Sequence, residues 1–273
     1  MREIVQIEEI KKIQLDLMKA VHIFCQENKL TYYLWGGSLL GAIRHNGYIP
    51  WDDDIDIAMP RKDYEYFCSN FNIDTYKVVS CGRDDEYFLP YAKAYDSRTL
   101  KEEVVCYRGK KRYGIDVDIF PIDTVGSYEN VEKTKAKRTK LIKKLIKSNY
   151  KFQKSTSALR TLVRAGRGIL YTFERKLGLL NSNKIANELN KMATSFNGES
   201  KDQMSYADPW RKVPFYMPQD WVDNIILHKF EDTQFCIMEK YDQVLSAYFG
   251  DYMTLPPEEQ RITHHNFKIF YKE

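Results

Sequence analysis

Hydrophobic residues recur at three- and four-residue steps along the first segment of the chain, from about Ile4 to Asn28. Lysine and glutamate fill many of the positions between them, which is the pattern of a helix with one apolar face. The recurring apolar residues are Ile10, Ile13, Leu17, Val21 and Phe24. The segment is therefore predicted to be an amphipathic helix packed on a core.

A glycine pair separates the next two predicted elements. Leu30–Trp35 is rich in aromatic residues and is expected to be a strand that leads into a tight turn at Gly36-Gly37. Ser38–Arg44 follows as a short helix, with Ser38 as its N-cap. His45-Asn46-Gly47 should end this helix, with Gly47 in the left-handed conformation.

Strands and helices continue to alternate up to about residue 125. The segment Lys62–Asn70 is expected to be a helix. The expected strands are Ile55–Ala58, stopped by Pro60, then Tyr76–Ser80, Tyr91–Tyr95, and Tyr113–Phe120, which ends at Pro121. This alternation predicts an α/β (α+β) fold, in which a mixed sheet core is covered by flanking helices.

The second half of the chain has a different character. From Glu129 to about Leu180 the pattern is helical and basic, and residues 181–225 read as irregular, while Phe235–Phe249 is expected to be a helix that ends at Gly250. We therefore expect three parts: a catalytic core at 1–126, a basic helical and irregular insertion at 127–225, and a closing segment at 226–273.

Composition narrows the class of protein. The 273 residues are 43% hydrophobic, enough for a packed core, and the five scattered cysteines form no CxxC pair that would suggest a zinc site or a disulfide framework. The N-terminus lacks a signal-peptide core, and no run of about 18 apolar residues is present. A cytoplasmic protein, peripheral at most to the inner face of the cell membrane, is expected.

Positive charge is concentrated between Lys133 and Lys176, where Glu174 is the only acidic residue. Apolar residues are interleaved with arginines from Leu159 onward, as in helices that lie in a membrane interface. A solvated helical insertion explains the same charges equally well. Nucleic acid is a third reading, and we do not expect it as a partner.

Carboxylates alternate with isoleucine in the segment Trp51–Ala58, which reads WDDDIDIA. Side chains two residues apart on a strand point the same way, so Asp54 and Asp56 should project together. Asp116 and Asp118 repeat this spacing in GIDVDIFPID. Paired carboxylates repel each other unless a cation lies between them, and oxygen ligands of this kind suit Mg²⁺ or Mn²⁺.

The acidic segment has two other possible interpretations. A solvated acidic loop is common, but the interleaved isoleucines place this segment on an element with one buried face. A calcium loop requires glycine at its sixth position, where this chain has Ile57, and its twelfth position is Asp63 rather than glutamate. A magnesium site is therefore favoured.

Gly36-Gly37-Ser38 would place backbone N–H groups at a helix N-terminus, where they can bind a phosphate. The combination of this turn with the aspartates some 16 residues later is more informative than either alone. Arg44 and His45 could add positive charge near the same phosphates. A surface ion pair is an equally good explanation of Arg44.

These segments together resemble the LicD family, to which the fukutin-related transferases are similar. The resemblance rests on LWGGSLLGAIRHNGYIPWDDDIDIAM, on YGIDVDIFPID, and on YFGDYMTLPPEEQR with the following His264-His265. It implies a nucleotidyltransferase-type fold and transfer of a phosphorylated alcohol, best known as phosphocholine from CDP-choline, to a hydroxyl of a cell-surface glycan or its lipid-linked precursor.

The resemblance also assigns roles to residues. Asp54 and Asp56 match the metal-binding pair, and Asp118 matches a third acid that either completes the metal shell or takes the acceptor proton. Asp116 is less certain. Predicted substrate contacts are Gly36, Gly37, Ser38, Arg44, His45, Lys93 and His265, with Arg261 nearby in the closing segment. Transfer of a nucleotide from an NTP, use of another CDP-alcohol such as ribitol or glycerol, and a non-enzymatic scaffold are the alternatives.

Overall fold

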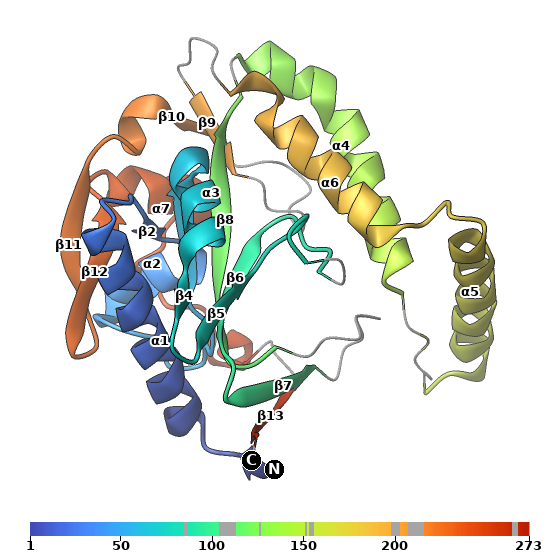
Figure 1. Ribbon diagram of the computed structural model, residues 1–273, viewed down its shortest axis with the longest axis horizontal. Helices are drawn as coiled ribbons and strands as arrows, with labels where there is room; N and C mark the ends of the chain where they lie inside the picture. Colours follow the sequence, from blue (N-terminus) through green and yellow to red (C-terminus); the bar gives the residue numbers. More distant parts are fainter. Residues whose placement is uncertain are drawn as a thin grey trace.

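A computed structural model shows a mixed sheet with helices packed against it (Figure 1). It describes residues 1–84, 87–103, 113–125, 127–150, 152, 156–197, 203–206, 216–263 and 267–272. The predicted α/β (α+β) class is confirmed. Within the described residues, no helix combines the length and the apolar character needed to cross a bilayer.

The long strand β8 (Asp116–Thr124) lies at the centre of the main sheet. It pairs in parallel with β3 along one edge and antiparallel with β6 and β9 along the other. The other strands of this sheet are β2 (Tyr33–Leu34), β3 (Asp56–Pro60), β4 (Asn72–Ile73), β5 (Tyr76–Val79), β6 (Ala92–Asp96), β9 (Gln203–Tyr206) and β10 (Tyr216–Pro218).

β8 passes through Pro121 instead of ending there, so the predicted stop was wrong. The N–H of Asp118 bonds to Ile55 O on the β3 side, so alternate residues, including position 121, direct their nitrogen to the other side. On that side the pairing with β6 reaches only Ile119, and the pairing with β9 begins at Ile122. Proline is tolerated because no ladder hydrogen bond is needed at this position.

Helices α1 (Ile7–Glu27) and α3 (Arg61–Asn70) pack against the main sheet. The predicted apolar face of α1 is confirmed, and Leu17, Met18 and Val21 are completely buried in the main core. The chain before α1 forms a short strand, β1 (Arg2–Ile4), so the helix begins later than predicted. β1 forms a small sheet with β13 (Phe267–Tyr271), which in turn pairs with β7 (Thr99–Glu103), and this brings the two termini together (Figure 1).

The predicted helix Phe235–Phe249 was wrong in its first part. Residues Thr233–Met238 form strand β12, which pairs with β11 (Ile225–Phe230) as a hairpin, and the helix α7 covers only Tyr241–Phe249. The run Phe235–Met238 is buried throughout, so its hydrophobicity carries no helical period. Gly250, with a φ of 73°, ends α7 as expected.

Helix α2 (Gly36–His45) follows the glycine turn as predicted, but its ends differ from the prediction. Trp35 is the N-cap residue, and Ser38 lies inside the helix. At the other end Asn46, with a φ of 57°, takes the left-handed conformation predicted for Gly47. Asparagine tolerates this conformation because its short polar side chain can bond locally.

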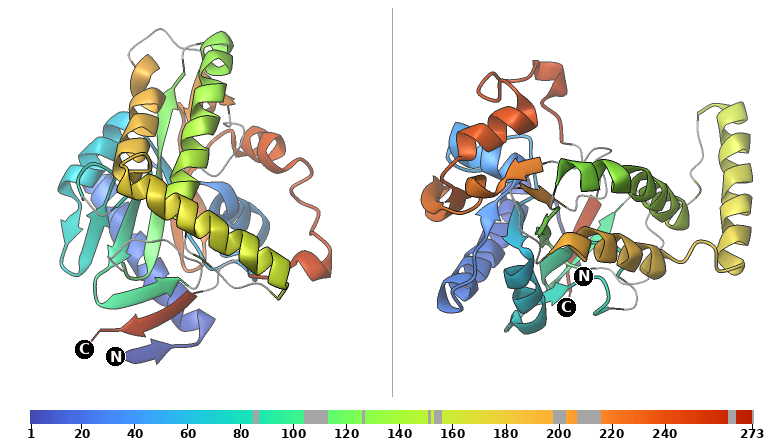
Figure 2. Two further views of the ribbon diagram at one scale, coloured as in Figure 1. Left: turned by 90° about the vertical axis from the view of Figure 1, so that its right-hand side faces the viewer. Right: turned by 90° about the horizontal axis from the view of Figure 1, so that it is seen from above.

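The basic part of the chain forms a helical arm, defined as α4 (Tyr128–Ser148), α5 (Ala158–Lys176) and α6 (Ser182–Ala193). α4 and α6 lie side by side, and α5 stands at their far end, away from the sheet (Figure 2). The reading of 181–225 as irregular was wrong, because α6, β9 and β10 fall in it. The predicted division of the chain at 126 and 225 stays a prediction. Three 3₁₀ turns also occur in the described residues, at Thr194–Phe196, Gln219–Trp221 and Glu258–Gln260.

A buried polar cluster attaches this arm to the core. Arg61, the first residue of α3, bonds both carboxylate oxygens of Asp123 in β8 and donates from Nη1 to Asn190 Oδ1 of α6 at 2.9 Å. Asn197 Nδ2 donates to Asp123 Oδ1 at 2.7 Å. The two-point contact between Arg61 and Asp123 fixes the approach of α6 to the sheet.

We expect Gly41→Ala to destabilise the protein by about 2 kcal/mol, although alanine favours helices. A Cβ at Gly41 would lie 2.4 Å from Gly47 O and 3.2 Å from Ile49 N, so the backbone of the following loop would have to move. Gly166→Ala in α5 is the matched control, because nothing lies within 4 Å of its Cβ position. Urea unfolding should show the two changes with opposite sign, and two equal effects would contradict the role of this contact.

Candidate active site

The pairing of β3 with β8 places Asp56 directly opposite Asp118. Asp54 precedes the strand, yet the alternation continues through it, because Ile55 and Ile57 are completely buried while Asp54 and Asp56 are half-buried. Asp56 lies close enough to Asp52, Asp54 and Asp118 for their charges to act on it. These four residues, Asp52, Asp54, Asp56 and Asp118, are called the acidic centre below. Sequence reasoning brought together three of them.

Asp52 is the member that the predicted metal-binding set of Asp54, Asp56 and Asp118 did not include. Its carboxyl group lies within hydrogen-bonding range of Asp54, and burial together with that neighbour raises the pKa of Asp52 to about 7. The sequence did contain a signal for Asp52, because Asp52, Asp54 and Asp56 are spaced two residues apart. This spacing places side chains on the same side only where the backbone is extended.

The glycine pair at the start of α2 makes room for these carboxylates. Gly36 has a φ of 52°, and a Cβ on Gly37 would lie 2.8 Å from Asp52 Oδ2. The Oδ2 atom of Asp56 lies 3.6 Å from the Cβ position of Gly36. Acidic side chains are stabilised at a helix N-terminus by its unpaired N–H groups.

Ser38 joins α2 to β3. It is buried, and its hydroxyl oxygen accepts a hydrogen bond of 2.8 Å from the backbone N–H of Asp56. The predicted capping role was wrong, and the predicted phosphate contact stays a prediction. The observed bond fixes the start of β3 against the helix that carries the glycine pair.

Lysines compensate only one side of the acidic centre. Lys93, in β6, is the register partner of Asp118, and its amine bonds both Asp116 Oδ2, at 2.5 Å, and Asp118 Oδ1. Lys101 Nζ donates to Asp116 Oδ1 at 2.8 Å. Asp116, whose role the sequence left uncertain, is therefore an anchor for two lysines. Lys101 could not have been found from the sequence, because β7 itself was not predicted.

The shifts in pKa follow this distribution of charge. Burial raises the pKa of Asp56 well above its usual range, and the like charges of Asp54, Asp118 and Asp52 raise it further. Burial also raises the pKa of Asp118 to about 6, although Lys93 opposes this. For Asp116, Lys101 and Lys93 outweigh burial and the pKa falls.

The chemistry of the acidic centre fits a divalent cation. Hard cations prefer carboxylate oxygens, and a bound cation would relieve the repulsion that Asp56 experiences. Among the described residues, no three His, Cys, Asp or Glu side chains already form a metal-binding group. The assignment of Mg²⁺ or Mn²⁺ to Asp54, Asp56 and Asp118 stays a prediction.

Arg44 and His45 lie at the far end of α2, about 10 Å along the helix from Gly37. Arg44 donates to His45 Nε2 at 3.0 Å and to Tyr252 O at 2.8 Å, and burial with the nearby Arg261 lowers the pKa of Arg44. Arg261 lies over the ring of Trp51, at 5.8 Å from its centroid. The two like charges form an environment suited to an anion.

His264 and His265 fall outside the described residues, so the predicted contact of His265 stays a prediction.

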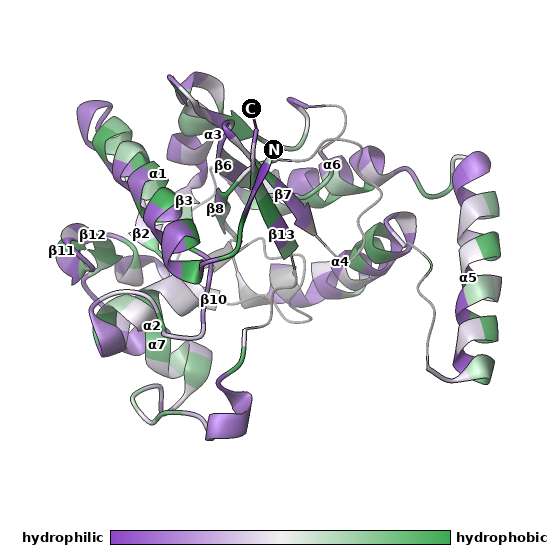
Figure 3. Ribbon diagram, turned by 90° about the horizontal axis from the view of Figure 1, so that it is seen from below, coloured by the Kyte–Doolittle hydropathy of each residue, from purple (hydrophilic) through white to green (hydrophobic). Residues whose placement is uncertain are grey.

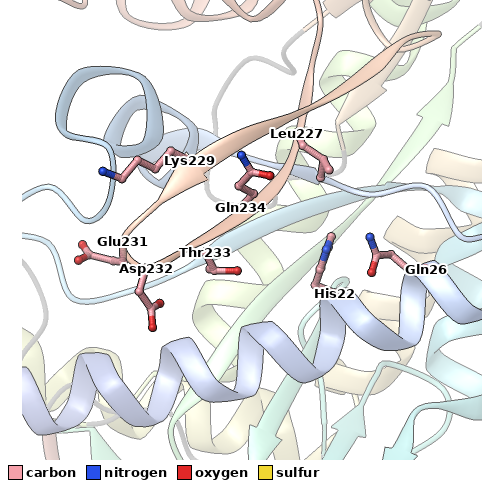
Figure 4. A pocket seen from close by; sticks show the side chains of 8 residues that line it. All are labelled: His22, Gln26, Leu227, Lys229, Glu231, Asp232, Thr233 and Gln234. Atoms are coloured by element: carbon pink, nitrogen blue, oxygen red, sulfur yellow. The ribbon is translucent and has the colours of Figure 1, made fainter.

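A hollow of about 700 Å³ lies between α1 and the β11–β12 hairpin, and none of the predicted site residues lines it (Figure 4). Its lining residues are His22, Gln26, Leu227, Lys229, Glu231, Asp232, Thr233 and Gln234.

Comparison with known proteins places this arrangement in a family. Residues 29–162 match the profile described as LicD/FKTN/FKRP, nucleotidyltransferase domain. The chain is 30% identical over 269 residues to the lipopolysaccharide cholinephosphotransferase LicD of Haemophilus influenzae, covering 95% of this chain and 96% of the relative.

Two further similarities are more local. A stretch of 117 residues is 27% identical to an uncharacterised protein of Rickettsia prowazekii and covers 39% of this chain and 41% of that protein. A stretch of 34 residues, 12% of this chain and 7% of the relative, is 53% identical to ribitol 5-phosphate transferase FKRP of Homo sapiens. With its acidic centre, its glycine turn and a relative that matches nearly end to end, the chain belongs to the LicD family.

Proposed function

We propose that this LicD-family enzyme transfers a phosphorylated alcohol, most directly phosphocholine, from a CDP-linked donor to a hydroxyl group of a cell-surface glycan or its lipid-linked precursor. One observation carries the proposal. The sequence similarity to a lipopolysaccharide cholinephosphotransferase covers 95% of a chain that brings four aspartates together, two of them beside a glycine pair at a helix N-terminus.

The acidic centre would hold Mg²⁺ or Mn²⁺ through Asp54 and Asp56, with Asp118 as the third acid. Such an ion, when bound, neutralises charge on a diphosphate as CMP leaves. Lys93 orients Asp118 through its Oδ1 atom. Asp118 could then bind the cation or accept the proton of the acceptor hydroxyl.

The donor would meet the chain at the glycine pair. The first N–H groups of α2 are suited to phosphate oxygens, and Ser38 holds these residues next to Asp56. Arg44 lies about 10 Å along α2 from Gly37, so Arg44 and the neighbouring Arg261 suit a second negative group of the donor or the acceptor. Their positive charges are unopposed by ion pairs within the described residues.

A second candidate shares the same centre. The family profile is described as a nucleotidyltransferase domain, which favours transfer of a nucleotide from an NTP as the alternative. The local similarity to a ribitol 5-phosphate transferase favours ribitol as an alternative alcohol. Nucleotide transfer and ribitol phosphate transfer would use the same arrangement of carboxylates. The substrate that is consumed distinguishes the two reactions.

The first experiment measures CMP release from CDP-choline, CDP-ribitol and CDP-glycerol, and pyrophosphate release from CTP, each with and without Mg²⁺. We expect Mg²⁺-dependent CMP release, greatest with CDP-choline. Asp54→Asn should lower it at least about a hundredfold, because the charge that would hold the cation is lost. Asp232→Asn, the same change on the exposed hairpin, is the control. Turnover of CTP alone would overturn the proposal in favour of nucleotide transfer.

Lys93→Met should lower the free energy of unfolding by about 3 kcal/mol, because Asp116 and Asp118 lose the cation they share. Lys19→Met is the matched control: it breaks a more exposed pair with Asp232 and should cost less than about 1 kcal/mol. Urea titration measures both. Adding Asp118→Asn to Lys93→Met should recover part of the loss, and equal effects of the two lysine changes would contradict the role of Lys93.

The raised pKa of Asp52 predicts how stability changes with pH in metal-free protein. A carboxyl group with a raised pKa binds more protons in the folded state, so its stabilising contribution is complete below about pH 4 and is lost as the pH rises through about 7. The Tm of Asp52→Asn, relative to the parent protein, should therefore increase by a few degrees between about pH 5 and pH 8.

Thermal melts in the presence of a chelator provide this measurement. Asp232→Asn serves as the control, because Lys19 lowers the pKa of Asp232 and its titration is complete below this range. A Tm difference for Asp52→Asn that stays constant across the range would contradict the raised pKa.

A further inference from the structure

Helix α5 packs against the rest of the protein through its polar face. Tyr150 donates a hydrogen bond of 3.0 Å to Arg164 O, and Arg175 Nη1 donates to Ser148 O at 3.3 Å. The ring of Tyr171 meets that of Tyr150 edge-on, at 5.3 Å between centroids. Arg164, Tyr171 and Arg175 therefore form these contacts with the end of α4 and the residue Tyr150 that follows it.

The opposite face of α5 is apolar and faces outward. At about 100° per residue, its large apolar side chains fall within an arc of roughly 120°. Leu162 is 72% exposed and Ile169 is 73% exposed, and none of the nineteen residues of this helix is buried. These side chains are called the apolar stripe below: Leu159, Leu162, Val163, Ile169, Leu170 and Phe173.

This orientation is the reverse of that in a solvated insertion, where apolar residues pack inward and charges face water. Figure 3 shows α5 apart from the body, with hydrophobic residues along its length. An exposed apolar surface of this extent marks a site of contact with another apolar phase or molecule.

The charges around the apolar stripe indicate which partner it contacts. Arg160 and Arg167 lie along one border of the stripe and Lys176 along the other, and Glu174 is the only acidic residue of the helix. The neighbouring helix α4 adds further exposed positive charge, at Lys140, Lys143, Lys144 and Lys147. An apolar band bordered by cations is complementary to a bilayer surface that carries anionic headgroups.

We propose that α5 is a membrane-docking helix that inserts the apolar stripe among the acyl chains of an anionic bilayer while Arg160, Arg167 and Lys176 contact the headgroups. Nucleic acid would use the charges and leave the stripe exposed to water. A second copy of the chain would cover the stripe but would bring the bordering cations of two helices together. The lipid surface alone satisfies both features. Docking of α5 to a bilayer is independent of the reaction proposed for the acidic centre.

The test is co-sedimentation of the full chain with vesicles of phosphatidylcholine alone or mixed with phosphatidylglycerol. We expect binding to the mixed vesicles, and a loss of at least about tenfold in partitioning for the double variant L162E/I169E. I23E is the matched control, because it places the same charge on an exposed position of α1 that is 52% accessible. Arg160→Gln with Arg167→Gln should weaken binding roughly tenfold without touching the stripe.

Far-UV circular dichroism and CMP release with a water-soluble acceptor separate docking from folding and catalysis. L162E/I169E should retain its helicity and its turnover while losing vesicle binding. Absence of vesicle binding by the parent protein would overturn the proposal, as would equal binding by I23E and L162E/I169E. A dimer of the parent protein in analytical ultracentrifugation that L162E/I169E dissociates would assign the stripe to a second copy instead.

Discussion

Two parallel strands at the middle of the sheet hold Asp56 and Asp118 side by side. Their negative charges repel each other, and much of the surrounding structure compensates for this repulsion. A carboxylate loses its hydration as the sheet closes around it, and a second one beside it adds to the cost. Lys93 stands on the adjacent strand at the same register as Asp118, so the sheet itself delivers the compensating charge. The glycine pair leaves room at the start of α2 for the carboxylates of Asp52 and Asp56.

Positive charge compensates some of these carboxylates more than others. The difference separates carboxylates that stabilise the fold from those that are available to bind a ligand. Asp116 has two lysines and a lowered pKa, which makes it a fixed part of the scaffold. Asp118 shares one lysine, and Asp56 has an ion pair with none of the described lysines or arginines. Negative charge at the start of β3 is therefore left without a compensating cation among the described residues. Active sites commonly retain such uncompensated charge for a ligand to neutralise.

The residues that form the local part of the site could be predicted from the sequence, whereas the residues that distant segments bring to it could be found only from the fold. Alternation in WDDDIDIA and the glycine turn located Asp54, Asp56 and the start of α2, because each depends on backbone periods of a few residues. Lys101 lies on β7, a strand that was not predicted, and the anchoring of Asp116 by Lys93 depends on the pairing of β6 with β8, which no local period specifies. The buried run at Phe235–Met238 has no period that distinguishes strand from helix. The basic block was read correctly as helical, but only the packing of Tyr150 against α5 shows which face is outward.

The buried cluster of Arg61, Asp123 and Asn190 fixes the orientation of the helical arm relative to the sheet. The same strand, β8, carries Asp118 five residues before Asp123, so one rigid element spans from the acidic centre to the root of the arm. A protein held at a surface by the tip of that arm would keep one orientation toward it. Its search for an acceptor in the same surface would then run in two dimensions, at an effective concentration set by the length of the arm instead of by the volume of the cell.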